Sequence, residues 1–464
     1  MLSKSFLYST TFGTLIILIL SSFFSLFYWL YSKKKSEAIT EIIIFLLLFA
    51  FAFSFSHSPF YGSFGDTYTQ TVLNNLLTSF VILLTITSII SSSDLMSKKL
   101  KYGEYYFLFL ISLTSSILLI NTQNIFNMFI SVELLSMSLY GLTGFNKNDK
   151  NLEASFKYFM LGSFASVFMI LSLVFLYIGL GSLSLVDIKN SLAISGPNPY
   201  INIGMLLFMS GFIFKLALVP MHSWAVDVYW GAPTNVSMFM ISGVKLSIVV
   251  ALYRLFSSYT TSVVIYAMYA FIVLSIVIPN LIALYSKDIK KIIIYSSISH
   301  AGYIAISFLG TENWQAYFYA IIYSISVIGV FSVIMFLEKN FKDLNYENIK
   351  GLYHSKPSIA ISLLIFLFSL SGVPPFSGFF AKFYSFYNAV NGGFKWLVVI
   401  AVLTSALSLY YYLKILIPAF MKDAKKRDYE GTVCNYAVIY LTAAATLLLG
   451  ILSNPIIELI KNSI

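Results

Sequence analysis

Cysteine is almost absent from this 464-residue chain, and charged side chains are few. The single cysteine, Cys434, cannot form an internal disulfide or hold an iron–sulfur cluster. Only 10% of the residues are charged and 58% are hydrophobic, whereas a water-soluble domain carries about 25% charged residues. The composition therefore excludes an ordinary soluble domain and indicates an integral membrane protein.

Sequence signatures for nucleotide and metal binding are also missing. The chain contains no GxGxxG and no GxxxxGK[ST] run, the motifs that cradle the phosphates of a dinucleotide or of ATP. Its histidines lie in separate segments without HExxH spacing, at His57, His222, His300 and His354. We therefore expect no cofactor and no metal ion in this chain.

Uninterrupted apolar runs fill most of the sequence. A helix needs about 20 apolar residues to cross the hydrocarbon core of a bilayer. The runs lie at residues 11–31, 40–56, 70–92, 105–120, 124–144, 154–180, 202–219, 234–254, 262–285, 291–309, 314–337, 357–391, 395–418 and 435–460. The sequence predicts an all-α polytopic membrane protein with about 14 transmembrane helices, and too little chain remains for a second domain of ordinary size.

Basic residues are distributed unevenly between the two sides of these spans. Most of the 29 lysines and arginines fall in alternate loops, at residues 33–35, 98–101, 147–150, 287–291, 339–356 and 422–427. Cytoplasmic loops carry such an excess of positive charge, so we expect both termini on the outer, periplasmic side of the cell inner membrane. The net charge of +10 is then explained by topology and anionic lipid, and no nucleic acid is expected as a partner.

Several charged side chains lie inside the predicted spans, where each costs about 2.5–3.5 kcal/mol at the helix centre. Lys157 and Lys414 lie near span ends, where the ammonium group of a long side chain can reach the lipid headgroups by snorkelling. The deepest charges cannot do so, and these are Glu133, Lys215, Lys245 and Lys382. Charges at such depth are usually retained for ion movement.

Two spans contain helix-breaking residues close to these lysines. Pro220 follows Lys215 by five residues, and a glycine- and proline-rich stretch at 372–378 precedes Lys382. Proline removes a backbone donor, and backbone groups freed at membrane depth persist only inside protein or beside water. Interrupted spans in two halves of a chain indicate a transport site built on inverted repeats.

Equal spacings along the chain support such a repeat. Glu133 and His300 are separated by 167 residues, and Lys215 and Lys382 by the same number. We therefore predict a single membrane domain with two inverted five-helix repeats, each containing a broken helix. The predicted parts are three N-terminal helices at 1–102, repeat 1 at 103–255 (helices 4–8), repeat 2 at 262–418 (helices 9–13) and a C-terminal helix at 435–460.

Titratable groups in mid-membrane are suited to carrying protons. A buried lysine binds its proton less tightly than one in water, and a nearby carboxylate reverses this effect. Glu133 close to Lys215 would therefore hold that lysine charged, and separating the two would release a proton to Lys245. The imidazole of His300 titrates near neutral pH, although a hydrogen-bonded structural histidine is the alternative interpretation of that residue.

Four motifs, in this order, resemble the antiporter-like membrane subunits of respiratory complex I and their relatives in multi-subunit cation/proton antiporters. They are SVELLSMSLYGL around Glu133, FKLALVPMHSWAVDVYWGAPTNVSMFMISGVKLS around Lys215 and Lys245, KKIIIYSSISHAGY around His300, and GVPPFSGFFAKFYSF around Lys382. The resemblance spans residues 103–418 and is greatest to the subunit N group of the proton-pumping NADH:quinone oxidoreductase (NDH-1). One departure is Val226, where the family usually has proline.

The resemblance implies a subunit of a translocase, in which quinone reduction elsewhere in the complex drives proton transfer. Glu133 and Lys215 would form a charge pair, Lys245 and His300 would relay the proton, and Lys382 would be the exit-side lysine. NADH, FMN, iron–sulfur clusters and quinone would belong to partner subunits, which include M-like, L-like and small membrane subunits. A sodium/proton antiporter subunit, a ferredoxin- or hydrogenase-linked pump and a purely structural subunit remain as alternatives.

Overall fold

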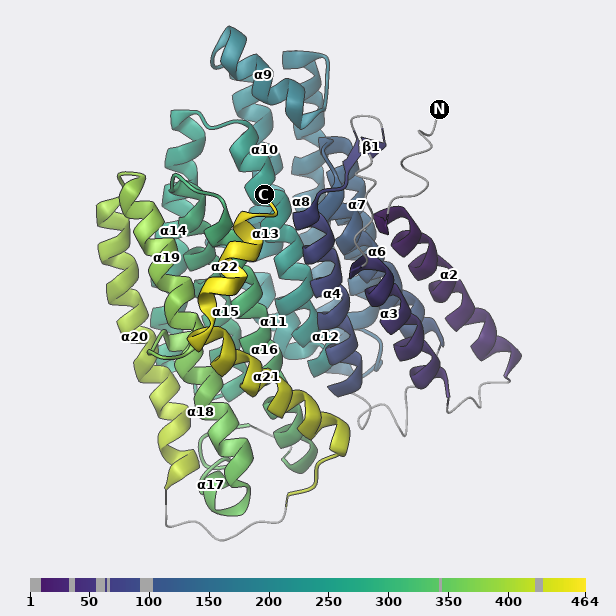
Figure 1. The fold of residues 1–464 in the computed structure, drawn as a ribbon, viewed down its shortest axis with the longest axis vertical. Coiled ribbons are helices and arrows are strands. Elements are labelled where there is room, and N and C mark those ends of the chain that lie inside the picture. The colour runs from purple at the N-terminus through teal and green to yellow at the C-terminus, as the bar shows by residue number, and fades with distance from the viewer. Residues whose placement is uncertain are drawn as a thin grey trace.

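A computed structural model of the chain describes residues 10–32, 38–55, 63–64, 67–91, 103–341, 344–421 and 429–464. Most of these residues are helical, and the helices lie side by side along the long axis of the molecule (Figure 1). The strands in this described part are β1 (Ser63–Phe64) and β2 (Tyr68–Thr69), which pair antiparallel as a small hairpin. The prediction of an all-α polytopic membrane protein is confirmed.

The helices occur in the predicted order. The N-terminal segment contains α2 (Thr10–Tyr31), α3 (Ile39–Phe55) and α4 (Val72–Ser91). The region of repeat 1 contains α6 (Gly103–Asn121), α7 (Ile125–Thr143), α8 (Asp149–Leu180), α9 (Leu185–Ser195), α10 (Pro199–Leu216), α11 (Ser223–Gly231), α12 (Thr234–Phe239), the π-helix η1 (Met240–Val244) and α13 (Lys245–Ser258).

The region of repeat 2 contains α14 (Ser262–Tyr285), α15 (Ile289–Ile306), the 3-10 helix η2 (Ser307–Leu309), α16 (Trp314–Asn340), α17 (Leu352–Ser355), α18 (Pro357–Ser371), α19 (Ser377–Asn391) and α20 (Lys395–Phe420). The chain ends in α21 (Val433–Ile451) and α22 (Ser453–Lys461). The C-terminal helix predicted at 435–460 is therefore divided at Leu452, which does not belong to either helix.

Twelve helices in the described residues are long and apolar enough to cross a membrane. The shorter apolar helices α3 and α18 also lie within the bundle, and α18 continues after a break into α19. If α3 and the α18–α19 pair each cross the membrane once, the described residues contain 14 spans, as predicted.

Polar side chains at helix starts explain several of these bounds. Asn124, Asn148 and Asp288 precede α7, α8 and α15, and each side-chain oxygen accepts a hydrogen bond from a backbone N–H in the first turn. Such caps satisfy donors that have no partner within the helix. At its other end α8 stops at Gly181, whose φ of 70° lies in the left-handed region that favours glycine.

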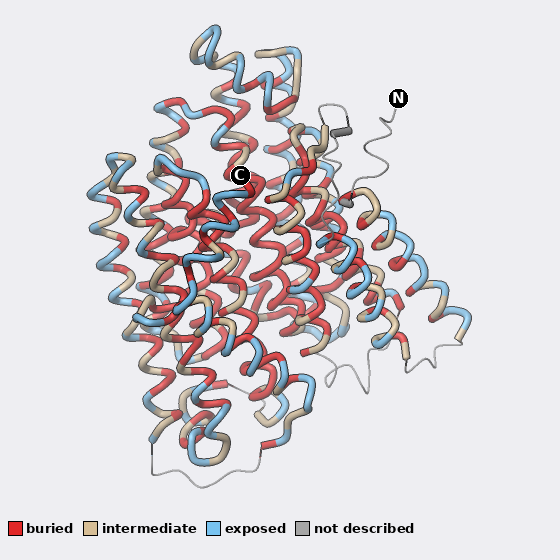
Figure 2. Tube along the Cα trace, viewed as in Figure 1, coloured by how far each residue is buried: buried red, intermediate tan, exposed pale blue. Residues whose placement is uncertain are grey.

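Buried residues gather where the two predicted repeats meet (Figure 2). The most apolar 18-residue window of the α12–α13 segment is 100% buried, whereas those of α8, α14 and α20 are 33% buried. The peripheral helices expose large apolar side chains such as Phe156 and Leu403. The central helices are therefore surrounded by protein, and the peripheral ones present apolar surface to lipid or to other subunits.

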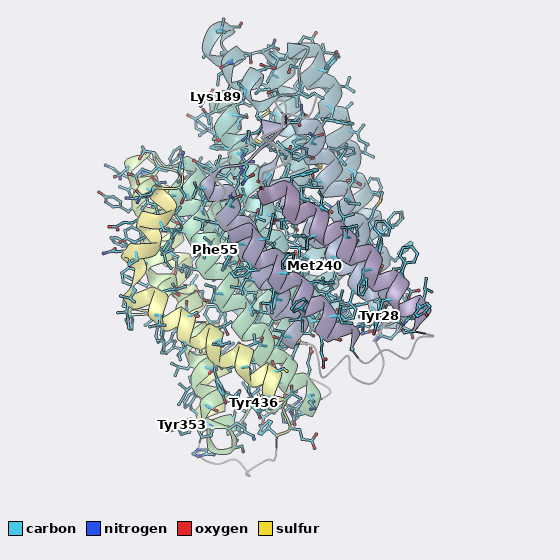
Figure 3. The ribbon with its side chains drawn as sticks, turned by 45° about the vertical axis from the view of Figure 1, so that its right-hand side comes forward. Tyr28, Phe55, Lys189, Met240, Tyr353 and Tyr436 are labelled. Atoms are coloured by element: carbon cyan, nitrogen blue, oxygen red, sulfur yellow. The ribbon has the colours of Figure 1, made fainter. Side chains whose placement is uncertain are left out.

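The two ends of the bundle differ in shape and charge. Lys189 of α9 lies at one end and Tyr353 and Tyr436 lie at the other, with Met240 between them (Figure 3). The 32 residues of α8 extend about 48 Å, more than the hydrocarbon core of about 30 Å. The segment from the end of α8 to the start of α10 therefore projects beyond the membrane on the Lys189 side.

We call the opposite end the lysine-rich end, because Lys150, Lys291 and Lys350 lie in the helix starts and the loop there. Lys147, Lys287, Lys339 and Lys356 of the same set are also described, whereas the basic residues at 33–35, 98–101, 342 and 422–427 lie outside the described residues.

Candidate functional site

The first broken helix consists of α10 and α11, which are separated at Pro220 as predicted. The indole Nε1 of Trp224 donates a 3.0 Å hydrogen bond to the carbonyl of Phe214, near the end of α10. The N–H of Val219 donates to the hydroxyl of Ser275 on α14 at 2.8 Å. Backbone groups freed by the break are thus satisfied by protein, as a break at membrane depth requires.

Lys215 is the second-last residue of α10 and is 7% exposed. Its Nζ donates a 2.6 Å hydrogen bond to the hydroxyl of Ser136 on α7. The ring centres of Tyr140, Tyr158 and Phe214 lie 5.7, 5.5 and 5.5 Å from Nζ. A hydroxyl and three aromatic rings therefore surround the ammonium group.

Glu133 lies one turn before Ser136 on α7, and its half-buried side chain accepts a hydrogen bond from the Ser166 hydroxyl of α8. The carboxylate interacts electrostatically with Lys215. Between these two described residues there is no direct ion pair within 4.0 Å. Ser136 is therefore the residue of α7 to which Lys215 bonds directly.

Lys245 begins α13 directly after the π-helix η1. Single π-helical turns within α-helices are frequent at functional sites. The Lys245 side chain is buried, and its Nζ donates a 2.8 Å hydrogen bond to the Ser297 carbonyl of α15. The ring centre of Tyr323 on α16 lies 5.9 Å from the same nitrogen.

His300 of α15 is buried among tyrosines. Its Nδ1 lies 3.1 Å from the hydroxyl of Tyr319, and its Nε2 lies 3.5 Å from that of Tyr412. Its ring stacks on Tyr323 with 5.0 Å between centres. Tyr323 therefore lies between Lys245 and His300 and contacts both.

The second broken helix consists of α18 and α19, which are separated within the glycine- and proline-rich stretch as predicted. The two halves approach so closely that a Cβ on Gly378 would lie 1.8 Å from the Ser369 carbonyl oxygen, so only glycine fits there. Lys382 of α19 is buried, and its Nζ donates to the carbonyl of Ser371 at 2.9 Å and to the hydroxyl of Ser405 at 2.8 Å.

Tyr303 of α15 connects His300 with Lys382. Its ring centre lies 5.8 Å from that of His300 and 5.0 Å from Lys382 Nζ. Its hydroxyl donates to Thr404 and accepts from Asn280, both at 3.0 Å. A continuous series of contacts therefore joins Lys245, Tyr323, His300, Tyr303 and Lys382.

The two tyrosines of this series were not among the residues selected from the sequence. Tyr303 has a signal, since it stands three residues after His300 in the SHAGY run and thus on a neighbouring part of one helix face. No sequence signal marks Tyr323, because it lies in a long apolar helix with several other tyrosines nearby.

Lys157 and Lys414, for which we expected snorkelling, also bind protein groups. Lys157 Nζ lies 2.7 Å from Glu153 and 2.8 Å from Asp227, so it joins α8 to the short helix α11. Lys414 Nζ donates at 2.9 Å to the Leu284 carbonyl in the last turn of α14, where the negative end of the helix dipole favours a cation. Each ammonium group thus has polar protein partners near the end of its span.

The departure at Val226 has little structural consequence. The residue is 8% exposed within α11, which is a continuous helix from Ser223 to Gly231. As for metal ligands, the described residues contain no group of three or more His, Cys, Asp and Glu side chains that could hold a metal ion.

Comparisons with known proteins place the chain in a family. The NADH:quinone oxidoreductase/Mrp antiporter transmembrane family matches residues 122–408. NADH-quinone oxidoreductase subunit N 1 of Thermodesulfovibrio yellowstonii is 39% identical over 391 residues, which cover 80% of this chain and 84% of the relative. Subunit N of Trichlorobacter lovleyi is 33% identical, covering 85% and 84%.

Solved structures share the fold over nearly the whole chain. A chain of respiratory complex I from Thermus thermophilus is 28% identical, with a TM-score of 0.83 and coverage of 96% of this chain and 98% of that one. A chain of an archaeal membrane-bound sulfane sulfur reductase has a TM-score of 0.89 at 23% identity, with coverage of 98% and 96%. At that identity the second likeness shows the fold alone.

The family match covers more than half of the chain, and relatives above 30% identity cover at least four fifths of it. The chain therefore belongs to the NADH:quinone oxidoreductase/Mrp antiporter transmembrane family, as a subunit of the N type.

Proposed function

We propose that this chain carries protons across the membrane as a subunit of NADH:quinone oxidoreductase, through Glu133, Lys215, Lys245, His300 and Lys382. The observation that carries the proposal is the series of contacts from Lys245 to Lys382. Lys245, His300 and Lys382 are 2%, 3% and 4% exposed and lie within apolar segments of the chain. Burying charge at this depth is costly, so such groups usually serve ion movement.

Contacts with half-helix ends suggest how the two lysines of the broken helices keep their charge. Lys215 is the second-last residue of α10, and Lys382 Nζ bonds to the carbonyl of Ser371, the last residue of α18. The C-terminal end of a helix carries partial negative charge, which stabilises a nearby cation. A shift of either half-helix would weaken that interaction and favour release of the proton.

Corresponding packing supports the two five-helix repeats. In repeat 1, α6 packs against α7 and α13, and in repeat 2 α14 packs against α15 and α20 in the same way. Likewise α8 packs against α10, and α16 packs against α18 and α19. Each broken helix thus has an equivalent set of neighbours, as repeats related by an inverted arrangement require.

The charge pattern supports an orientation in the cell inner membrane. The lysine-rich end faces the cytoplasm by the positive-inside rule, and both termini then lie on the periplasmic side. NADH, FMN, iron–sulfur clusters and quinone are held by partner subunits. M-like, L-like and small membrane subunits dock on exposed apolar faces such as that of α8, which includes Phe156 and Phe164.

The second candidate function for the same residues is that of a sodium/proton antiporter subunit. A chain of the Mrp complex from Dietzia sp. has a TM-score of 0.83 with this one, but at 18% identity the likeness shows the fold alone. The relatives at 33–39% identity described above are subunits N. Proton translocation driven by NADH oxidation is therefore the function that we propose.

The substitution Lys245→Met tests this proposal in the assembled complex. Methionine keeps most of the length of the side chain but cannot bind a proton, so the relay loses a member while helix packing changes little. Proton pumping driven by NADH in sodium-free inverted vesicles should fall strongly. Lys157→Met is the matched control, because Lys157 is 40% exposed and paired outside the series.

Native gels establish that both variants assemble before pumping is compared. Parental pumping by assembled Lys245→Met would show that the proposed series does not carry protons. If the parental complex pumps in the presence of sodium but not in its absence, the result would favour the sodium/proton antiporter function.

A further inference from the structure

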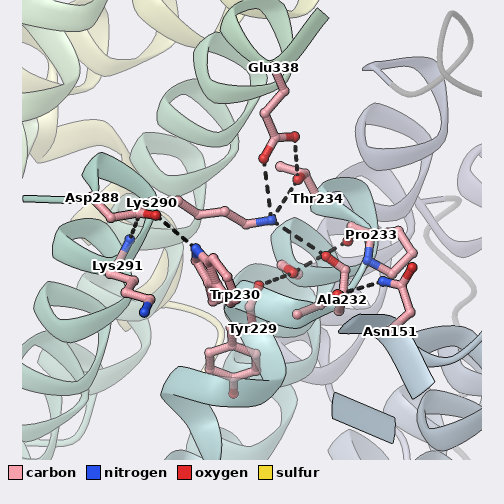
Figure 4. A network of polar contacts seen from close by, with 12 residues as sticks. Asn151, Tyr229, Trp230, Ala232, Pro233, Thr234, Asp288, Lys290, Lys291 and Glu338 are labelled. Carbon is pink, nitrogen blue, oxygen red and sulfur yellow. Dashed lines mark hydrogen bonds and ion pairs between the residues drawn. The ribbon is translucent and has the colours of Figure 1, made fainter. Parts of the chain in front are cut away.

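A cluster of polar side chains at the lysine-rich end joins the two predicted repeats and does not belong to the relay described above (Figure 4). At its centre is Lys290, which is 4% exposed. The sequence analysis counted this lysine with the loop residues at 287–291. The structure corrects that placement, because Asp288 caps α15 and Lys290 lies in the first helical turn with its side chain buried.

Three groups contact the Lys290 ammonium. Its Nζ donates to the Thr234 hydroxyl at 2.7 Å and to the Ala232 carbonyl at 3.5 Å, and it lies 3.4 Å from Oε1 of Glu338. The Thr234 hydroxyl in turn donates to Oε2 of Glu338 at 2.5 Å. A hydroxyl therefore bridges the amine and the carboxylate, in a hydrogen-bonded chain along which a proton can pass.

The three members of this chain differ in their access to solvent. The Glu338 side chain is 26% exposed, and that of Lys290 is 5% exposed. Thr234 is likewise buried, at 5%. The carboxylate therefore lies at the surface with the amine behind it, so a proton from the solvent meets Glu338 first.

The helices that carry Lys290 and Thr234 lead toward the relay. On α15, Ser297 lies seven residues after Lys290, which is about two turns or 10 Å, and its carbonyl accepts the hydrogen bond from Lys245 Nζ. Thr234 begins the helical segment that contains Lys245 eleven residues later. The cluster is thus connected to Lys245 by two helices.

Neighbouring contacts hold the last turn of α11, just before the loop to α12, in place. Asp288 accepts a 2.9 Å hydrogen bond from Nε1 of Trp230. The ammonium groups of Lys150 and Lys291 lie 3.4 and 4.4 Å from the centre of the Trp230 ring. These cation–π contacts tie the end of α11 to α8 and α15 and help to position Thr234, which follows Trp230 by four residues.

From this arrangement we infer that Glu338, Thr234 and Lys290 form the proton uptake site at the lysine-rich end. The inference rests on the proposed function. When Lys290 passes its proton inward, its neutral amine takes the hydroxyl proton of Thr234, and Thr234 takes the proton that Glu338 has bound from solvent. One proton enters at Glu338 and one leaves at Lys290, and the restored carboxylate pairs again with the ammonium.

The substitution Glu338→Gln tests this inference, because glutamine keeps the shape and a hydrogen-bonding oxygen but cannot bind a proton at neutral pH. The assembled complex is reconstituted in vesicles, and the NADH-driven membrane potential is followed with a voltage-sensitive dye. Potassium formate is then added, since a small weak acid can carry protons into a site that has lost its carboxylate. Formate collapses a pH gradient but not the potential, so the readout remains valid.

We expect Glu338→Gln to pump several-fold more slowly than the parental complex and formate to restore most of that rate. Glu338→Asp should retain more activity than Glu338→Gln. The matched control is Glu347→Gln, which changes an exposed carboxylate in the loop after α16, and it should pump at the parental rate with the parental response to formate.

Two results would overturn the inference: parental pumping by Glu338→Gln, or slow pumping that formate does not improve, which is what a purely structural clamp predicts. If Glu338→Gln fails to assemble, Thr234→Val removes the bridging hydroxyl and keeps both charges. Slow pumping by that variant supports the inference, and parental pumping contradicts it.

Lys215→Met in the same series separates this inference from the proposed function. If Lys215→Met abolishes pumping while Glu338→Gln does not affect it, only the uptake site is wrong. If Lys215→Met also pumps at the parental rate, the relay itself is wrong.

Discussion

Lys215 and Lys382 occupy corresponding broken helices but have different partners. Lys215 of α10 bonds to a single hydroxyl, that of Ser136 on α7. Glu133 lies one turn before Ser136 on α7. Lys382 bonds to a backbone carbonyl and to the hydroxyl of Ser405, and its ammonium also lies over the Tyr303 ring. In the described residues the contacts of Lys382 include no carboxylate.

A buried lysine ammonium group can therefore be stabilised in two ways. The ammonium of Lys215 depends on a side-chain charge, which a neutralising substitution or a movement of α7 can remove. That of Lys382 depends on dipoles of the backbone and of a hydroxyl, which are present whatever the protonation state of other groups. Substitutions that remove the acidic partner should therefore affect the first site and spare the second.

The largest effect should come from Lys382→Met, because it removes the buried ammonium group at the repeat 2 break. We expect strong loss of NADH-driven proton pumping, comparable with the loss in Lys245→Met, in a complex that assembles normally. Lys395→Met changes an exposed lysine at the start of α20 and should have little effect. Parental pumping by Lys382→Met would remove this lysine from the relay.

The next largest effect should come from Glu133→Gln, which removes the acidic partner of Lys215 while keeping its shape. Because the two groups interact, Glu133→Gln combined with Lys215→Met should cost much less than the sum of the single effects. When Glu133→Gln is instead combined with Lys382→Met, the effects of the two substitutions on the logarithm of the pumping rate should add. A double-mutant cycle on the pumping rate measures both couplings, and equal couplings in the two combinations would abolish the contrast between the sites.

A smaller effect should follow from removal of single hydroxyls. Ser136→Ala removes the only hydrogen-bond acceptor of Lys215 in the described residues, whereas Ser405→Ala leaves Lys382 its bond to the Ser371 carbonyl. We therefore expect Ser136→Ala to lower the initial pumping rate more than Ser405→Ala. The reverse order would mean that Glu133 fully compensates for the loss of the serine.

The smallest effect should come from Lys414→Met, because this lysine caps the end of α14 and does not contact the relay. The substitution should lower the stability of the folded chain by about 0.3–1 kcal/mol, the usual contribution of a cation at a helix C-terminus. Pumping by the assembled complex should remain at the parental rate. Thermal denaturation and pumping assays on the same preparation check the two expectations separately.

The sequence was sufficient for features that depend on local chemistry. Pro220 and the 372–378 stretch predicted both helix breaks, since proline removes a backbone donor and glycine adopts conformations outside the helical range. The charges at Glu133, Lys215, Lys245 and Lys382 were predicted to lie at membrane depth because they are too far from the span ends for their side chains to reach the lipid headgroups. All three lysines are buried in the structure, and Glu133 is half-buried.

Features that depend on packing between helices could not be predicted. Ser136 rather than Glu133 contacts Lys215, because the choice between two side chains one turn apart depends on how α7 faces α10. Tyr323 joins Lys245 to His300 only through the crossing of α13, α15 and α16. Lys290 was taken for a loop residue because the burial of a first-turn side chain depends on its neighbours.

The central claim is that buried side chains of this chain carry the pumped protons, and Lys215→Met tests it most directly. Methionine removes the charge at the first broken helix and preserves most of the side-chain volume, so the complex should assemble. The measurement is the number of protons released per NADH oxidised in sodium-free vesicles, made together with the rate of quinone reduction. We predict that proton release falls strongly, with quinone reduction slowed as well if the two processes are tightly coupled. An assembled Lys215→Met complex that pumps protons at the parental rate and yield would contradict the account.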